Sequence, residues 1–293
     1  MRRRTRRLLP AVAGLAAALG LAGPVAAQEP EWTDLRIRRT ADRGLDSLRV
    51  RVEYAAGRLA IHRAAPDLLY DVRLRYDARE VEPARSWEED GGVGRLDIRV
   101  TPEHGELDDV EFDDEASGRL DLGIGAGVAT ALRVEAGAAE TRLELGGLPL
   151  TGLVYRTGAS RSEISFDTPN PVRLADLEFA AGAAEFRATG LGNARFDRLT
   201  FEGAVGDVTL DFGGAWEGEA RADIAMGLGA LRLVLPRGVG IEIRHRGLLA
   251  GFDPEGLVKN DGVWRTPGFE DASRRLRISV RAAFGKVDVD FTD

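Results

Sequence analysis

The sequence contains no cysteine and few aromatic residues. Without cysteine the chain forms neither disulfides nor thiolate metal sites, and it has no thiolate nucleophile. Aromatic residues make up 6% of the chain, which argues against an outer-membrane β-barrel with its aromatic girdles. After residue 27 no segment is continuously apolar over the length of a membrane-spanning helix, so we expect a soluble mature chain without a transmembrane segment.

The N-terminus has the three parts of a secretory signal peptide. The basic stretch MRRRTRR is followed by the apolar run LLPAVAGLAAALGLAGPVAAQ, and Val25-Ala26-Ala27 form a small-residue cleavage signal before Gln28. An uncleaved membrane anchor is the alternative, but the glycine and proline content of the apolar run favours cleavage. We therefore predict a signal peptide at residues 1–27 and export to the periplasm, the surface or the medium of a bacterium.

The charge balance limits the class of partner. Residues 1–27 carry five arginines and no acidic residue, which leaves 35 basic and 48 acidic residues and a net charge of −13 in residues 28–293. Nucleic acids require a basic surface, and anionic lipids are repelled by the same charge. We therefore expect an unknown protein or an envelope glycan as the partner.

Short segments of one pattern recur along the chain. Glycines lie in small-residue stretches between alternating runs, at separations of 20 to 24 residues. Such a period is typical of a repeat protein, and we interpret these glycines as structural corners. The corner glycines are Gly137, Gly158, Gly182, Gly203, Gly206, Gly227 and Gly247.

The runs after the corners alternate apolar and polar residues, as strands with one buried face do. Examples are TRLEL, SEISF, DVTLDF, ALRLVL and KVDVDF. We predict an all-β protein, a right-handed parallel β-solenoid with coils of roughly 20–24 residues and few, short helices, in which each coil stacks on the previous one. An antiparallel sandwich or barrel is the structural alternative. The predicted interior residues are Leu143, Leu145, Ile164, Phe166, Val208, Leu210, Phe212, Leu231, Leu233, Leu235, Val287, Val289 and Phe291.

Two segments interrupt this pattern. The acidic stretch Glu106 to Glu115 marks a soft boundary between an N-terminal β region, residues 28–118, and a C-terminal solenoid domain, residues 119–293. One continuous stack is the alternative. The second interruption, residues 251–275, is rich in turn-forming residues and precedes the last strands.

The stretch LGNARFDRLTFEGAVGDVTLDFGG, with the segments IAMGLGALRLVLPRGVGIEI and LRISVRAAFGKVDVDF, resembles a known family. It is similar to the bacterial toast-rack family and to the C-terminal domains of cell-wall-active-antibiotic-response proteins, and to adhesin-like domains of unknown function. The stretch LRVRVEYAAGRLAIHRAAPDLLYDVRLRYDARE resembles the N-terminal toast-rack segment. The resemblance implies a stack of β coils exposed in the bacterial envelope, without an enzymatic activity or a cofactor.

Candidate chemistry is sparse. His62, His104 and His245 lie in different units, so we expect ordinary histidines rather than ligands to a metal. The acidic stretch Glu106 to Glu115 lacks the spacing of known calcium loops, and we expect a solvated loop. The outward carboxylates, such as Asp207 and Asp288, are explained by solubility, although paired acids on a solenoid also suit a polysaccharide-cleaving enzyme. We predict no catalytic, cofactor or metal residues.

Phe252, Trp264 and Phe269 lie in or beside the turn-rich segment. They could form an interaction patch, because aromatic side chains dominate contact surfaces. The alternative, which we favour, is a cap over the open end of the solenoid, where an edge strand must be covered.

The sequence therefore predicts an exported, non-catalytic envelope protein with a structural or adhesin-like interaction role. The alternative is a polysaccharide-binding or polysaccharide-active protein that uses one face of the solenoid. A third hypothesis is a partner of an envelope-stress sensing system.

Overall fold

The computed structural model describes residues 30–41, 44–102, 118–252 and 254–292. The chain divides into two units, Met1–Pro30 and Glu31–Asp293, and the second unit is described below. Its described residues form 16 β-strands and two short 3-10 helices, which confirms the prediction of an all-β fold with few, short helices. No helix among the described residues is both long and apolar enough to cross a membrane.

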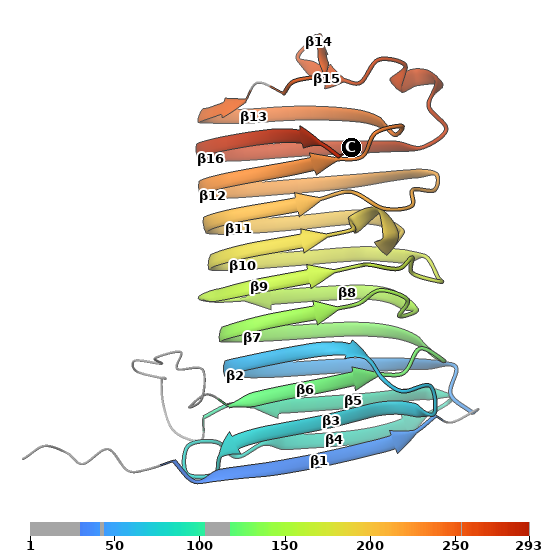
Figure 1. Ribbon diagram of the computed structural model, residues 1–293, viewed down its shortest axis with the longest axis vertical. Coiled ribbons are helices and arrows are strands. Elements are labelled where there is room, and N and C mark those ends of the chain that lie inside the picture. The colour runs from blue at the N-terminus through green and yellow to red at the C-terminus, as the bar shows by residue number, and fades with distance from the viewer. Residues whose placement is uncertain (1–29, 42–43, 103–117, 253, 293) are drawn as a thin grey trace, which may run out of the picture. The chain divides into compact units, whose positions relative to one another are not determined.

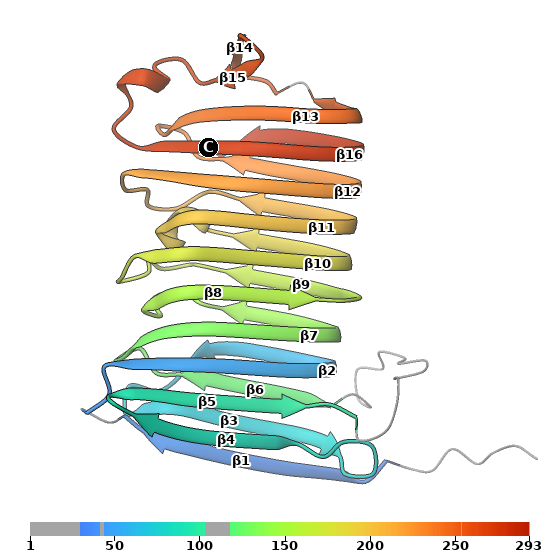
Figure 2. The same ribbon diagram turned by 180° about the vertical axis from the view of Figure 1, so that it is seen from behind.

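Most of the long strands bend near their middle. Figures 1 and 2 show that they cross one layer, turn at one edge of the stack and return in a facing layer. Strands β8 and β9 together form one such unit, and we call each unit a rung. The rungs are β2 (Ser47–Arg63), β7 (Ala129–Glu144), β8 (Leu150–Thr157) with β9 (Ser160–Ser165), β10 (Leu174–Thr189), β11 (Phe196–Asp211), β12 (Glu219–Leu235), β13 (Gly240–Phe252) and β16 (Arg275–Phe291).

Shorter elements lie at the two ends of the sheet and in the loops. The remaining strands are β1 (Trp32–Thr40), β3 (Leu68–Asp77), β4 (Ala84–Asp90), β5 (Val93–Val100), β6 (Arg119–Ile124), β14 (Val258–Asn260) and β15 (Val263–Arg265). The two 3-10 helices are η1 (Leu191–Ala194) and η2 (Phe269–Asp271).

The rungs stack in parallel and in register, as the sequence period indicates. Ala184 on β10 pairs with Gly206 on β11, 22 residues later, and Gly206 pairs with Gly229 on β12, 23 residues later. Parallel pairing therefore places equivalent residues of successive rungs directly above one another. The handedness of the coil stays a prediction.

The sequence predicts that each coil stacks on the coil before it. At both ends of the sheet the strand order differs from this prediction. The last strand, β16, lies between β12 and β13, so that β13 forms the final rung although it comes earlier in the sequence. At the other end β2 lies between β6 and β7, and β1, β3 and β6 pair antiparallel. The predicted boundary between residues 118 and 119 stays a prediction, and strands from both sides of it share one sheet.

The core lies between the two layers of each rung. Eleven of the predicted interior residues are buried, and Val289 and Phe291 are partly buried against the core. Aromatic rings pack on one another within a rung and between rungs. The ring centroids of Phe179 and Phe186, both on β10, are 5.2 Å apart, and those of Phe186 and Phe201 on β11 are 5.1 Å apart. Burial of each large apolar side chain contributes about 1.5–3 kcal/mol, so the alternating pattern fixes which face of each strand points inward.

Candidate functional site

The bends of successive rungs lie above one another and form an open groove of about 950 Å³. The groove crosses β2, β7, β8, β10, β11 and β12, and its floor consists of small residues. A Cβ atom on Gly137 would lie 2.3 Å from the carbonyl oxygen of Ala55, and one on Gly227 would lie 2.4 Å from that of Ala204. The close approach of neighbouring backbones therefore keeps side chains out of the floor at these positions.

Charged side chains lie along one wall of the groove. Glu53 accepts a hydrogen bond of 2.8 Å from Nε of Arg99, and the side chain of Glu135 lies 2.6 Å from that of Arg133. The hydrogen bond from Arg99 is the main cause of a lowered pKa of Glu53. Desolvation opposes it, and the positive charges of Arg51 and Arg99 lower the pKa further. The carboxylate of Glu53 is therefore held in its ionised form.

The predicted corner glycines occupy three different places. Gly137, Gly158, Gly182, Gly203 and Gly227 line the groove. Gly206 lies two residues after Ala204, which lines the groove on the same rung, β11. Gly247 is exposed on β13, where it pairs with Ala282. Among these seven glycines only Gly206 has a positive φ, of 144°. At Gly137 and Gly227 it is the close approach of the neighbouring backbone, not an unusual backbone conformation, that requires glycine.

A second column of glycines, which the sequence analysis did not single out, stacks on Gly206. Gly206 pairs with Gly229, and Gly229 pairs with Gly285, with φ of 134° at Gly229 and 124° at Gly285. A Cβ atom on any of the three would lie 1.9 Å from a carbonyl oxygen of the neighbouring rung. A signal was present in the sequence, because each of these glycines lies two residues before a buried apolar residue, Val208, Leu231 or Val287.

An apolar column lies at the bends beside the groove floor. Val205, Leu228 and Phe284 are in register on β11, β12 and β16. About half of each side chain is exposed, with fractions of 50% for Val205, 52% for Leu228 and 48% for Phe284. Three large apolar residues on adjacent strands form a continuous exposed stripe.

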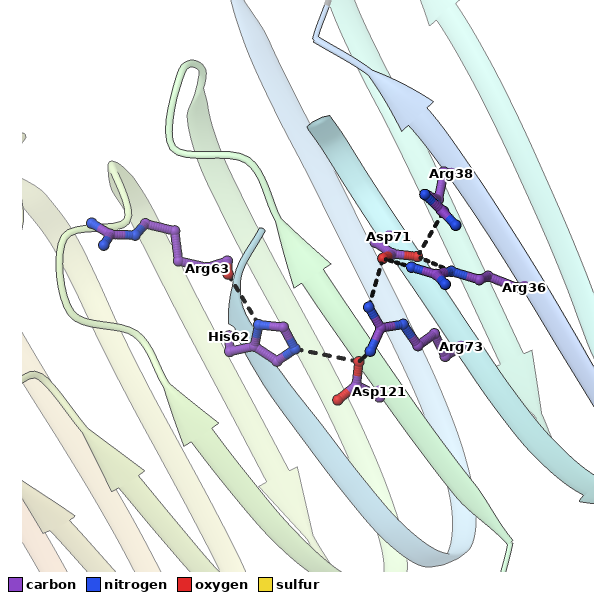
Figure 3. A network of polar contacts seen from close by, with 7 residues as sticks. All are labelled: Arg36, Arg38, His62, Arg63, Asp71, Arg73 and Asp121. Carbon is purple, nitrogen blue, oxygen red and sulfur yellow. Dashed lines mark hydrogen bonds and ion pairs between the residues drawn. The ribbon is translucent and has the colours of Figure 1, made fainter. Parts of the chain in front are cut away.

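A group of arginines surrounds one carboxylate near the other end of the stack. Arg36 and Arg38 on β1 and Arg73 on β3 converge on Asp71, as Figure 3 shows, and we call these four residues the arginine cluster. Arg36 donates two hydrogen bonds to Asp71, of 3.2 Å from Nε and 2.8 Å from an Nη atom, and Arg73 donates one of 3.1 Å. The hydrogen bond from Arg36 is the main cause of a lowered pKa of Asp71.

A second carboxylate extends this cluster (Figure 3). Asp121 on β6 lies 3.9 Å from an Nη atom of Arg73 and 3.3 Å from Nε2 of His62. The other ring nitrogen of His62 lies 3.0 Å from the carbonyl oxygen of Arg63. The antiparallel strands β1, β3 and β6 thus bring together residues that are far apart in the sequence.

The predicted aromatic patch is only partly assembled. Phe252 and Trp264 are in contact, with ring centroids 5.7 Å apart, and both pack against the core. Phe269 is buried beneath the guanidinium groups of Arg265 and Arg277, whose central carbons lie 5.4 and 5.5 Å from its ring centroid. His245 stacks on Phe252 at 4.6 Å. The choice between a cap and an interaction patch stays a prediction.

The described part of the chain contains no candidate metal site. No three or more His, Asp and Glu side chains within it are placed to hold an ion. His62 lies on β2 and His245 on β13, two strands that do not pair with each other in the sheet. His104 and the acidic stretch Glu106 to Glu115 lie outside the described residues. The hypothesis of a calcium loop there stays untested.

Comparison with known proteins gives one family match. The model of the N-terminal domain of toast_rack, DUF2154, matches residues 28–187, from before β1 into β10. No protein with a curated description matches the chain. Among solved structures, the chain is similar to a candidate cell adhesion protein of Clostridium sporogenes, with 12% identity and a TM-score of 0.47, over 89% of this chain and 100% of that chain. It is also similar to a candidate adhesin of Bacteroides fragilis, with 8% identity and a TM-score of 0.35, over 90% of this chain and 100% of that chain.

Proposed function

Since the chain belongs to the family of the N-terminal domain of toast_rack, DUF2154, we propose that it is an exported, non-catalytic interaction module of the bacterial cell envelope. The signal peptide predicted at residues 1–27 supports export. The observation that carries the proposal is the open groove along the bends of the rungs, to which we assign the contact with a partner.

The form of the groove suits an extended partner. Neighbouring strands in a sheet lie about 4.8 Å apart, so a groove that crosses six rungs is about 24 Å long. The column of Val205, Leu228 and Phe284 offers an apolar surface beside its floor. Exposed apolar side chains that form a continuous stripe favour contact with another molecule over contact with water.

The charges of the groove wall support a role in binding rather than in acid–base catalysis. A general acid at neutral pH needs a carboxyl group with a raised pKa. The pKa of Glu53 is instead lowered, first by its hydrogen bond from Arg99. Glu135 is likewise paired, with Arg133 at 2.6 Å. These carboxylates are therefore suited to orienting arginines along the wall.

A groove-filling substitution tests the proposal. Ala204 is exposed in the groove, and Ala204→Trp adds a bulky side chain there without requiring a new backbone conformation. Ala230→Trp is the control. Ala230 lies on β12, the rung next to that of Ala204, but it does not line the groove. The tagged wild-type protein and both variants are purified from the native envelope, and bound molecules are identified by mass spectrometry and glycan analysis.

We expect wild type and Ala230→Trp to retain the same partner and Ala204→Trp to lose it. Equal recovery by all three proteins would contradict the assignment of the groove. Cleavage of envelope polymers by the purified protein, with loss of activity in Glu53→Gln, would contradict the non-catalytic role.

A further inference from the structure

We propose that the arginine cluster binds the carboxylate groups of an acidic polysaccharide. The cluster lies on β1 and β3, away from the groove, so this inference goes beyond the proposed function and concerns a second ligand site. It is argued from the local charge, the geometry of the guanidinium groups and the neighbouring residues.

The outward faces of four neighbouring strands hold more basic than acidic groups, although the chain as a whole is acidic. The strand register places the side chains of β1, β3, β6 and β2 in common columns. On this face lie six arginines and four aspartates: Arg36, Arg38, Arg58, Arg73, Arg75, Arg119, Asp34, Asp71, Asp77 and Asp121. The excess of positive charge is concentrated in the cluster, where three arginines share Asp71.

Asp71 holds the arginines in place and leaves many of their N–H groups available. The Asp71 side chain is only 10% exposed, whereas those of Arg36, Arg38 and Arg73 are 45%, 52% and 54% exposed. Nε of Arg38 lies 3.9 Å from the Asp71 carboxylate, which is beyond hydrogen-bond distance. Among the described residues Arg38 makes only this ion pair with Asp71 and no side-chain hydrogen bond, so its half-exposed guanidinium keeps N–H donors for a ligand beside Arg36.

A carboxylate is the group that this arrangement fits. The planar guanidinium binds a carboxylate through two parallel hydrogen bonds, and Arg36 already binds Asp71 in this way. Because Asp71 orders the side chains before a ligand arrives, less conformational entropy is lost on binding. The ligand is therefore an anion with planar carboxylates placed over Arg36, Arg38 and Arg73.

The shallow position of the cluster favours a polymer over a single small anion. Each exposed ion pair is weak, so useful affinity requires several contacts made by one molecule. Side chains along one strand are about 6.8 Å apart and those on neighbouring strands about 4.8 Å apart, a spacing that an extended chain with repeated carboxylates can follow.

A flexible glycan chain fits this face better than a membrane or an acidic peptide. A broad anionic surface would also meet the many acidic residues elsewhere on the protein, whereas a thin chain contacts this face alone. Trp32 lies in the same outward column of β1 as Arg36 and Arg38, with the guanidinium of Arg75 5.1 Å from its ring centroid. An indole ring on the same face as the arginines, about 13 Å along β1 from Arg36, suits the C–H face of a sugar ring in an extended chain.

Calorimetry with short oligogalacturonates as the probe tests the site. We expect binding at low ionic strength that weakens toward about 0.15 M salt, because exposed charges are screened. The triple variant Arg36→Ala/Arg38→Ala/Arg73→Ala should bind about tenfold more weakly or not at all. The triple variant with lysine at the same positions keeps the charge but loses the planar fork, and it should also bind more weakly than wild type.

A matched control removes the same charge elsewhere. Arg142, Arg161 and Arg187 are exposed arginines on β7, β9 and β10, and their joint replacement by alanine should leave the affinity within about twofold of wild type. Since the first triple variant leaves Asp71 without a partner, Arg38→Ala serves as a second variant that keeps both hydrogen-bonding arginines of Asp71. It should lower the affinity with an unchanged circular dichroism spectrum.

Three results would overturn the inference: no binding of oligogalacturonate by wild type at low salt, equal loss of affinity in the control triple variant, or tighter binding of poly-glutamate than of oligogalacturonate. The last result would assign the site to an acidic peptide. Because Ala204→Trp leaves the cluster intact, failure of the groove assignment and failure of this site are distinguishable.

Discussion

The stacked glycines at the second column make the stability of the protein sensitive to a single methyl group. Gly206 has φ of 144°, and a Cβ atom there would lie 1.9 Å from the carbonyl oxygen of Ala184 on the rung below. Real Cβ atoms essentially never come within 3.0 Å of such an atom. Gly206→Ala must therefore move two hydrogen-bonded rungs apart or rotate the backbone out of its parallel pairing.

The size of the effect follows from two contributions. A non-glycine residue in a sparsely populated backbone region costs about 1–3 kcal/mol, and forcing extra volume into a packed site costs about 1–3 kcal/mol more. We expect Gly206→Ala to lower the free energy of unfolding by about 2–6 kcal/mol. With a urea m-value of about 3 kcal/mol/M for a large domain, the midpoint of unfolding should fall by about 0.7–2 M.

Urea unfolding followed by tryptophan fluorescence and circular dichroism measures this effect. Gly152→Ala is the matched control, because Gly152 also lies in a rung, on β8, but a Cβ atom there meets no atom within 4 Å. Its free energy of unfolding should stay within about 0.5 kcal/mol of that of wild type. Equal midpoints for Gly206→Ala, Gly152→Ala and wild type would refute the reasoning from close approach.

Two further predictions concern the ends of the stack. Trp264→Ala should lower the melting temperature, with a loss of about 2 kcal/mol, because Trp264 packs on Phe252 and the core; unchanged stability with lost partner binding would assign these rings to an interaction patch instead. The hydrogen bond from Arg36 is the main cause of the lowered pKa of Asp71. The ionised carboxylate therefore stabilises the folded state above about pH 4, and this contribution is lost as the pH falls through the folded-state pKa. The urea midpoint of wild type should therefore drop in acid, and Asp71→Asn should show a smaller drop; identical pH profiles would contradict this assignment.

The sequence predicts the parts of the fold that depend on local pattern. Alternation alone identifies Val208, Leu210 and Phe212 as interior residues, because a strand with one buried face repeats every two residues. The 20 to 24 residue period likewise predicts the parallel stacking, since equivalent residues of successive rungs must pair.

The order of rungs at the ends could not be predicted in this way. Strands β13 and β16 both alternate, and each could pair with β12, so nothing in their local pattern shows that β16 is placed between the other two. The arginine cluster could not be predicted either, because it too depends on which strands pair. Arg36 and Asp71 are 35 residues apart and meet only because β1 pairs antiparallel with β3.

The geometry that allows the rungs to stack also creates the surface to which we assign a partner. At the bends the neighbouring backbones come so close that glycine and alanine are required, and the floor of the groove therefore has no long side chains of its own. Elsewhere on the outward faces, charges on adjacent rungs pair with one another, such as Arg142 with Glu163 and Arg161 with Glu185. Such pairs leave little net charge for a ligand. We therefore expect binding where surface or charge is left without a partner in the stack. These places are the uncovered bends and the arginine cluster, where three arginines share the single carboxylate of Asp71.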